Sequence, residues 1–281
     1  MNQQLELNRC ENLDYRLPEK LREILNGFKY AVHEKNTSAV IIIDGRSGMG
    51  KTTLNNQCGK YCDENYDLSK IHYNPETFLN GGEGKIGLLQ AKKGDWIVFD
   101  EAMLISNRST LSAINRMIIQ AMSMIRSKNI FVCFCVNSIF DLDKNLALSR
   151  ADLLLHVYGQ SLTDRGRFCA FFRGADGEDR LKMLYLLGKK FYDYSRPQSN
   201  FFARFPKNFV VNEEAYEQQK QIGVNNFLNS MTKQSNNKAQ LSRDKLVLHL
   251  RKTTDLTIEE VANITGVSPR TIDNIIARYR T

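Results

Sequence analysis

The chain has 281 residues, of which 42% are hydrophobic and 25% are charged, and its formal net charge at pH 7 is +8. This length can bury one α/β domain of about two hundred residues and still leave a small second module. No apolar run reaches the roughly eighteen residues that span a bilayer, and residues 1–6 lack the features of a secretion signal. We therefore expect a cytoplasmic protein without stable membrane insertion, and the positive charge favours a polyanionic partner.

The cysteines argue against a zinc site, because no pair has the C-x-x-C spacing and no histidine cluster accompanies them. We interpret them as reduced thiols of the core. They are Cys10, Cys58, Cys62, Cys133, Cys135 and Cys169.

After a helical lead-in at residues 1–35, the first large domain is expected at 36–228. It opens with an apolar, β-branched run at 39–43, typical of a strand buried on both faces, and a helix is predicted from Thr52 onward. Between them lies a loop that matches the phosphate-binding pattern G-x-x-x-x-G-K-[ST]. The loop and its first following residue are Gly45, Arg46, Ser47, Gly48, Met49, Gly50, Lys51, Thr52 and Thr53. Strand, glycine loop and helix in this order predict a binding site for ATP.

The residue types of this loop suit that chemistry. Glycines permit backbone torsions that turn consecutive N–H groups toward phosphate oxygens. Lys51 is expected to reach the β- and γ-phosphates, and the Thr52 hydroxyl to ligate Mg²⁺.

A second apolar strand is predicted at 96–100, and it ends in the adjacent acids Asp100 and Glu101. Asp100 would hold the Mg²⁺, and Glu101 would polarise the attacking water as a general base. A small-molecule kinase needs no such base, so the pair indicates hydrolysis. The two motifs together resemble the additional-strand, catalytic-glutamate division of P-loop proteins, to which RecA-like, AAA+ and FtsK/HerA ATPases belong.

A third buried strand is predicted at 129–137 and ends at Asn137. The resemblance implies that this strand lies between the loop strand and the strand of Asp100, which would make Asn137 a sensor of the γ-phosphate. The alternative is that Asn137 caps a helix predicted near 139–148.

The same resemblance implies a ring-shaped homo-oligomer in which an arginine of the neighbouring subunit completes the site. Arg150 follows the sensor at the spacing that AAA+ proteins use for this finger. Arg116, Arg126, Arg165 and Arg167 are competing candidates, and any of the five could be an ordinary surface charge.

Downstream, strands are predicted at 152–158 and 167–173, and a hairpin at 181–194. The stretch 192–209 interleaves aromatic with basic residues. It could hold single-stranded nucleic acid, although core packing is the preferred interpretation. A helix at 213–231 then leads to a polar linker at 229–240.

Residues 241–281 resemble a helix-turn-helix DNA-binding domain. Ser268 would cap its second helix, and Gly266 would allow the turn. The expected inner face consists of Val261, Val267, Ile272 and Ile275. The expected DNA-facing residues, besides Ser268, are Arg270, Thr271, Asn274 and Arg278. The alternative is a helical unit for protein contact.

The predicted fold is α/β, a P-loop NTPase with a mostly parallel RecA-like sheet flanked by helices, plus a small all-α domain. Over about residues 36–160 the chain resembles the FtsK/HerA and Zot-like branch. That resemblance implies an ATP-hydrolysing, DNA-associated motor or switch of a phage, plasmid or other mobile element, acting in DNA translocation, transfer or packaging. Asn137 stands where this branch usually has glutamine. A transposition or helicase-loading AAA+-like ATPase, and an ATP-gated helix-turn-helix transcription regulator, therefore remain alternatives.

Overall fold

The computed structural model describes residues 15–100 except 83, residues 125 and 127–253 except 160 and 162, and residues 256–278. The chain divides into two compact units, Met1–Val224 and Asn225–Thr281. Each unit is described by itself.

The first unit is built on a seven-stranded sheet in the order β2-β3-β4-β1-β5-β6-β7. Its strands are β1 Ala39–Asp44, β2 Ile71–His72, β3 Trp96–Asp100, β4 Phe131–Val136, β5 Leu153–Tyr158, β6 Arg167–Phe172 and β7 Phe201–Arg204. The pairs from β2 to β5 are parallel, and β6 and β7 are antiparallel. The predicted mostly parallel sheet is confirmed, and β4 lies between β1 and β3 as predicted.

The adjacent strands β3, β4 and β1 are buried along their whole length, which explains their nearly unbroken apolar sequences. Asp44 at the end of β1 pairs with Val136 of β4, and Asp100 at the end of β3 pairs with Cys135. Because these strands are parallel and in this register, the segments that follow them meet at one edge of the sheet.

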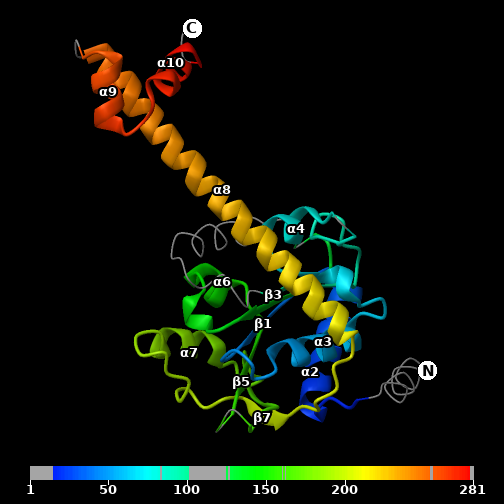
Figure 1. The fold of residues 1–281 in the computed structure, drawn as a ribbon. Helices are drawn as coiled ribbons and strands as arrows, with labels where there is room; N and C mark the ends of the chain where they lie inside the picture. Colours follow the sequence, from blue (N-terminus) through cyan, green and yellow to red (C-terminus); the bar gives the residue numbers. More distant parts are fainter. Residues whose placement is uncertain are drawn as a thin grey trace. The chain divides into compact units, whose positions relative to one another are not determined.

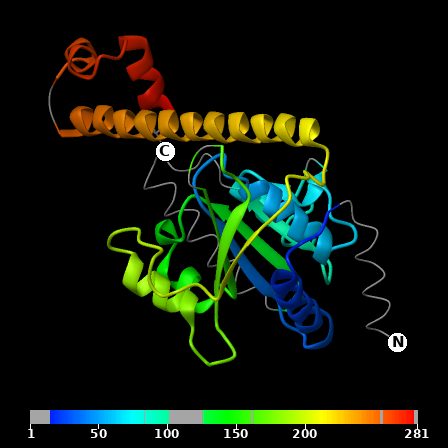
Figure 2. The same ribbon diagram turned by 90° about the horizontal axis from the view of Figure 1, so that it is seen from below.

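Helices cover both faces of the sheet: α2 and α3 lie on one side and α6 and α7 on the other (Figures 1 and 2). Before α8, the helices in the described part of this unit are α2 Glu19–Glu34, α3 Lys51–Cys62, α4 Pro75–Asn80, α6 Lys144–Ser149 and α7 Arg180–Gly188, with 3-10 turns at Leu68–Lys70 and Ile139–Asp141. Leu21 and Leu25 of α2 and Leu54 of α3 share one hydrophobic core with the strands. This core fixes the helix that follows the glycine loop.

The hairpin predicted at 181–194 is wrong, because its first half forms helix α7. Leu181, Leu184, Tyr185 and Gly188 are buried, and this spacing follows the helical period rather than the two-residue period of a strand. The Asp179 side chain accepts a hydrogen bond from the Lys182 amide and caps the helix.

The aromatic stretch at 192–209 is mostly packing. Phe201 and Phe205 are buried in the core, and the Tyr194 ring stacks on His156 with centroids 3.7 Å apart. Tyr192 and Phe202 are exposed at 54% and 77%.

Helix α8, Glu213–Thr253, begins in the first unit and ends in the second. The polar linker predicted at 229–240 is therefore not an irregular segment, since its backbone continues the helix. Residues 224–253 contain neither glycine nor proline, so a helix that has begun at 213 can extend through polar residues at little cost per residue. Neither α8 nor any other helix in the described ranges has both the length and the apolar character needed to cross a bilayer.

The second unit also contains α9, Ile258–Thr265, and α10, Pro269–Arg278. The predicted inner face is confirmed, because its four apolar residues are buried together with Val247 of α8. Thr257 and Glu260 form a capping box at the start of α9, and Gly266 ends it with a left-handed φ of 65°.

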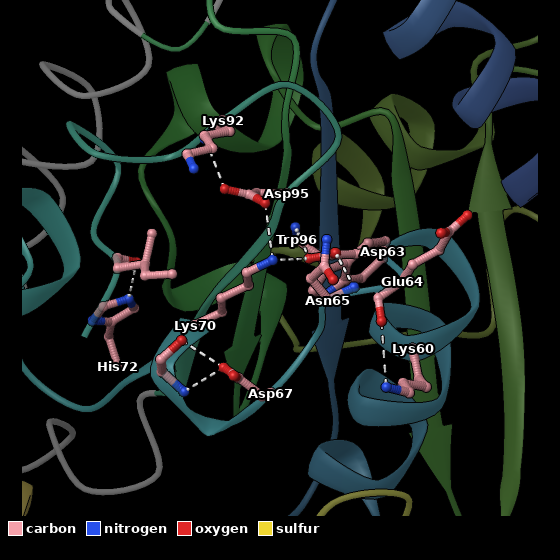
Figure 3. A network of polar contacts seen from close by, with 12 residues as sticks. Lys60, Asp63, Glu64, Asn65, Asp67, Lys70, His72, Lys92, Asp95 and Trp96 are labelled. Atoms are coloured by element: carbon pink, nitrogen blue, oxygen red, sulfur yellow. Dashed lines mark hydrogen bonds and ion pairs between the residues drawn. The ribbon is translucent and has the colours of Figure 1, made fainter. Parts of the chain in front are cut away.

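A buried lysine ties the start of β3 to the end of α3 (Figure 3). Lys70 is 2% exposed, and its ammonium lies 2.6 Å from Asp63 Oδ2 and 2.9 Å from Asp95 Oδ1. Asp63 also accepts the Trp96 amide, and Asp95 accepts the Lys92 amide. Burial lowers the pKa of Lys70, but the hydrogen bonds to the two carboxylates outweigh it, so the pKa lies above its ordinary value. Lys70 and the two aspartates therefore fix the start of β3 beside the end of α3.

Lys70→Met is expected to lower the free energy of unfolding by about 3–5 kcal/mol, because two buried carboxylates would lose their counter-ion. Urea unfolding measures the change. Lys60→Met is the matched control, since the Lys60 ammonium donates to the Glu64 carbonyl at 3.5 Å and pairs with no carboxylate of the described residues. Equal stability of the two variants would contradict a structural role for the buried group.

Candidate nucleotide-binding site

The glycine loop leaves β1 at Asp44 and enters α3 at Lys51. Gly45 has a φ of 137°, and a Cβ there would lie 2.1 Å from the Val157 carbonyl oxygen of β5. Gly50 starts α3 with a φ of 100°, and no side chain caps the first amides of this helix. The loop therefore needs glycine at these positions, and the end of α3 that favours anions is left open to a ligand.

Lys51 places a buried cation at this point. The residue is 7% exposed, and its ammonium donates to the Gly45 carbonyl at 2.6 Å and to Asn137 Oδ1 at 3.2 Å. Burial lowers its pKa, while Cys135, Asp100 and Asp44 act in the opposite direction. These two partners, from the described part of the chain, are neutral oxygens, whereas a buried charge normally contacts an opposite one. The site is thus suited to an anionic ligand.

Two oxygen ligands for a divalent cation lie beside the lysine. Thr52 Oγ1 is 3.1 Å from Asp100 Oδ2, and Asp100 is 3% exposed. Adjacent ligands of an octahedral Mg²⁺ lie about 2.9 Å apart when each bond is about 2.05 Å. The hydroxyl and the carboxylate therefore have the chemistry and the spacing that Mg²⁺ needs.

Asn137 follows β4 and faces the lysine through its side-chain oxygen, and its backbone oxygen accepts the Gly45 amide at 3.2 Å. It does not cap the following helices. Ser138 caps the 3-10 turn and Asp143 caps α6. The Asn137 side chain is therefore directed at Lys51, at the end of the glycine loop.

A cavity of about 420 Å³ adjoins the loop. It is lined by Gly48, Met49, Gly50, Thr53, Thr163, Arg165, Gly166, Phe205, Pro206 and Lys207. Its position beside the start of α3 and its mixture of an aromatic ring, hydroxyls and cations suit a base and a ribose. Phe205 comes so close to the loop that a Cβ on Gly50 would lie 3.1 Å from its ring.

Several residues of the site were not predicted from sequence. Tyr216 of α8 donates to Asp100 Oδ2 at 2.6 Å, and burial together with the Asp100 charge raises the pKa of its phenol. Asp44 is fully buried, accepts the Ile139 amide at 2.8 Å and lies 2.8 Å from His156 Nδ1. For the contacts around Asp44, the only sequence signal was a carboxylate directly before the glycine loop. Tyr216 had no sequence signal.

The arginine candidates are spread apart. Glu101, Arg116 and Arg126 lie outside the described residues. Arg150 is exposed at the end of α6, near the amino edge of the sheet, because β5 begins three residues later. It is remote from Lys51 of its own chain, so a finger role would need the site of a second copy.

Arg165 lines the cavity, and Arg167 Nε lies 3.3 Å from Asp164.

In the second unit, the predicted contact residues lie on α10 or at its start. Ser268 Oγ accepts the Thr271 amide at 3.3 Å and lies 2.8 Å from Thr271 Oγ1. Arg270 and Asn274 are exposed. The side chain of Arg278 is outside the description.

No protein-family model and no curated protein matches the chain. Among solved structures, the N-terminal domain of zonular occludens toxin from Neisseria meningitidis is similar over 64% of this chain and 98% of its own, with 12% identity and a TM-score of 0.34. The FIGL-1 AAA domain in complex with ADP is 14% identical over 54% of this chain and 61% of its own, with a TM-score of 0.31.

The VirB11 ATPase of the Brucella suis type IV secretion system, in complex with sulphate, is 15% identical over 58% of this chain and 55% of its own, with a TM-score of 0.32. At such scores the likenesses are distant. The assignment to the P-loop type of fold rests instead on the strand order and the glycine loop of this chain.

Gly45→Ala is expected to destabilise the protein by about 2 kcal/mol or more, because the methyl group would collide with the Val157 carbonyl and the φ is unfavourable. Thermal unfolding tests this. Gly27→Ala in α2 is the control, since nothing lies within 4 Å of its added Cβ, and it should be neutral or slightly stabilising. Wild-type stability of Gly45→Ala would contradict the close approach of loop and β5.

Proposed function

We propose that this protein is an ATP-hydrolysing, DNA-associated motor or switch. The observation that carries the proposal is the buried Lys51 ammonium at the open end of α3, whose hydrogen-bond partners among the described residues are the neutral oxygens of Gly45 and Asn137. A triphosphate supplies the missing negative charge, and the adjoining cavity leaves room for its nucleoside.

The proposal gives each residue of the site a role. Lys51 neutralises the β- and γ-phosphates, and Thr52 and Asp100 hold the Mg²⁺, which offsets charge on the phosphates when it is bound. Asn137, hydrogen-bonded to Lys51, contacts the γ-phosphate. Glu101 follows Asp100 directly and activates the attacking water. Arg150 reaches the site of a neighbouring subunit in a ring.

DNA is the proposed partner of the second unit. The buried apolar face of α9 and α10 leaves Arg270 and Asn274 exposed, and such side chains suit phosphates and base edges. We propose that α10 is the recognition helix of a helix-turn-helix, with Thr271 and Arg278 contributing contacts.

A second candidate is a non-motor regulator, in which ATP occupancy gates the DNA-binding unit. The observation that favours it is that α8 begins at the nucleotide site and ends among the helices of the second unit. Translocation requires hydrolysis that DNA stimulates severalfold, whereas a switch can hydrolyse slowly and without regard to DNA.

Lys51→Ala is expected to abolish ATP turnover, because the phosphates would lose their buried counter-ion. The assay measures phosphate release without DNA and with single-stranded or duplex DNA. Lys60→Ala, at the far end of the same helix, should behave as wild type. Unchanged turnover in Lys51→Ala would refute the ATPase proposal, and turnover indifferent to DNA would favour the regulator.

Replacing both Arg270 and Arg278 by alanine is expected to weaken DNA binding. It should also reduce the slope of log affinity against log salt by about two units, since each phosphate contact contributes about 0.9. Fluorescence anisotropy over a salt series measures this.

The double variant Lys245→Ala, Lys252→Ala removes the same charge from exposed positions of α8 and serves as the control. An equal effect of both double variants would indicate general charge attraction. An unaltered affinity and slope would make the unit a protein-contact domain.

A further inference from the structure

The hydroxyl of Tyr216 lies among the oxygens that would hold the metal. It donates to Asp100 Oδ2 at 2.6 Å and lies 3.4 Å from Thr52 Oγ1. Asp100 Oδ2 therefore accepts two hydrogen bonds, one from Thr52 and one from Tyr216. A cation bound to Asp100 Oδ2 would occupy a position where this structure has the hydrogen of a donating hydroxyl. The phenol and the metal therefore compete for the carboxylate.

The Tyr216 ring cannot swing aside by itself. It is 1% exposed and is held between Tyr73 and Phe209, whose ring centroids lie 5.9 Å and 5.3 Å from its own. Release of the hydroxyl must therefore shift the backbone that carries the ring, which is the first turn of α8.

The following turns of α8 are attached to the same core. Gln219 Oε1 accepts the Lys85 ammonium at 2.7 Å, and a Cβ on Gly223 would lie 2.9 Å from Tyr73. Lys220 lies close enough to Lys51 to contribute to the lowering of its pKa. The start of α8 is thus part of the site, and a change at the metal position reaches a helix that ends in the second unit.

We propose that Tyr216 is a latch: its hydroxyl and the metal compete for the same side of Asp100, and loading with Mg²⁺-nucleotide displaces the hydroxyl and loosens the first turns of α8. The inference rests on the proposed nucleotide site. The rival role is a positioning residue that orients Asp100 toward the metal and stays in place.

Tyr216→Phe separates the two roles, since it keeps the ring and removes the hydroxyl. Binding of a fluorescent, non-hydrolysable ATP analogue to the full chain is measured by anisotropy, in excess Mg²⁺ and in EDTA. The latch predicts about tenfold tighter binding of the variant in Mg²⁺, because the metal no longer displaces a charge-assisted hydrogen bond, and little change in EDTA. Weaker or unchanged binding in Mg²⁺ overturns the latch.

Tyr185→Phe is the matched control. Tyr185 is 2% exposed, lies on α7, and donates to the Leu142 carbonyl at 2.9 Å. The variant should lose the hydrogen bonds of one buried hydroxyl, to Leu142 and from Lys189, without any change in Mg²⁺ dependence. The same gain in Tyr185→Phe would mean a general loosening and would overturn the latch.

Hydrogen exchange on the wild-type chain tests the latch without a variant. Amides at 213–223 should exchange faster in Mg²⁺ with the ATP analogue than in EDTA with the same analogue, and unchanged or slower exchange overturns the proposal. Failure of the wild type to bind the analogue in either condition would refute the nucleotide site itself, which is a different outcome from binding without a response of α8.

Discussion

The site at the start of α3 is arranged around the buried ammonium of Lys51, which has no anionic hydrogen-bond partner within the part of the chain that the structure describes. Burial lowers the pKa of Lys51 and the carboxylates of Asp100 and Asp44 counteract this, yet the described hydrogen-bond partners of the ammonium are neutral oxygens. Desolvating a charge in this way is costly unless a ligand completes the site. The glycines of the loop and the uncapped first turn of α3 leave that place to an anion.

Parallel strand pairing brings the other groups to the same edge. β1, β3 and β4 end side by side, so Asp44, Asp100 and Asn137 lie close together although the chain separates them widely. Further side chains stabilise this edge. Asp44 contacts His156 of the neighbouring strand β5. Tyr194 stacks on that histidine and donates to the same carboxylate. The carboxylate also accepts the Ile139 amide, so it fixes the turn that follows Asn137.

Helix α8 belongs to both units. Its first turns contact Asp100 and Lys85, and its last turns contribute Val247 to the core of the second unit. This helix is the covalent connection between the proposed nucleotide site and the unit that contains α9 and α10. The polar sequence of its middle part, without glycine or proline, keeps that path helical.

Local pattern determined much of this protein from the sequence alone. The glycine loop with its flanking strand and helix, the buried strand ending at Asp100, and the inner face of α9 and α10 each depend on residues that are neighbours in the chain, where spacing reports which face is buried. The sequence of α7 also contains its helical signal, because its buried positions are spaced with the helical period.

Only the tertiary structure decided the contacts between distant residues. Tyr216 meets Asp100 across 116 positions, and Lys70 meets Asp63 and Asp95 from three different segments. Such pairs have no local signature, because a hydroxyl or an ammonium looks the same in a sequence whether it faces water or a buried carboxylate. Their energies arise from desolvation and close approach, which exist only after the chain has folded.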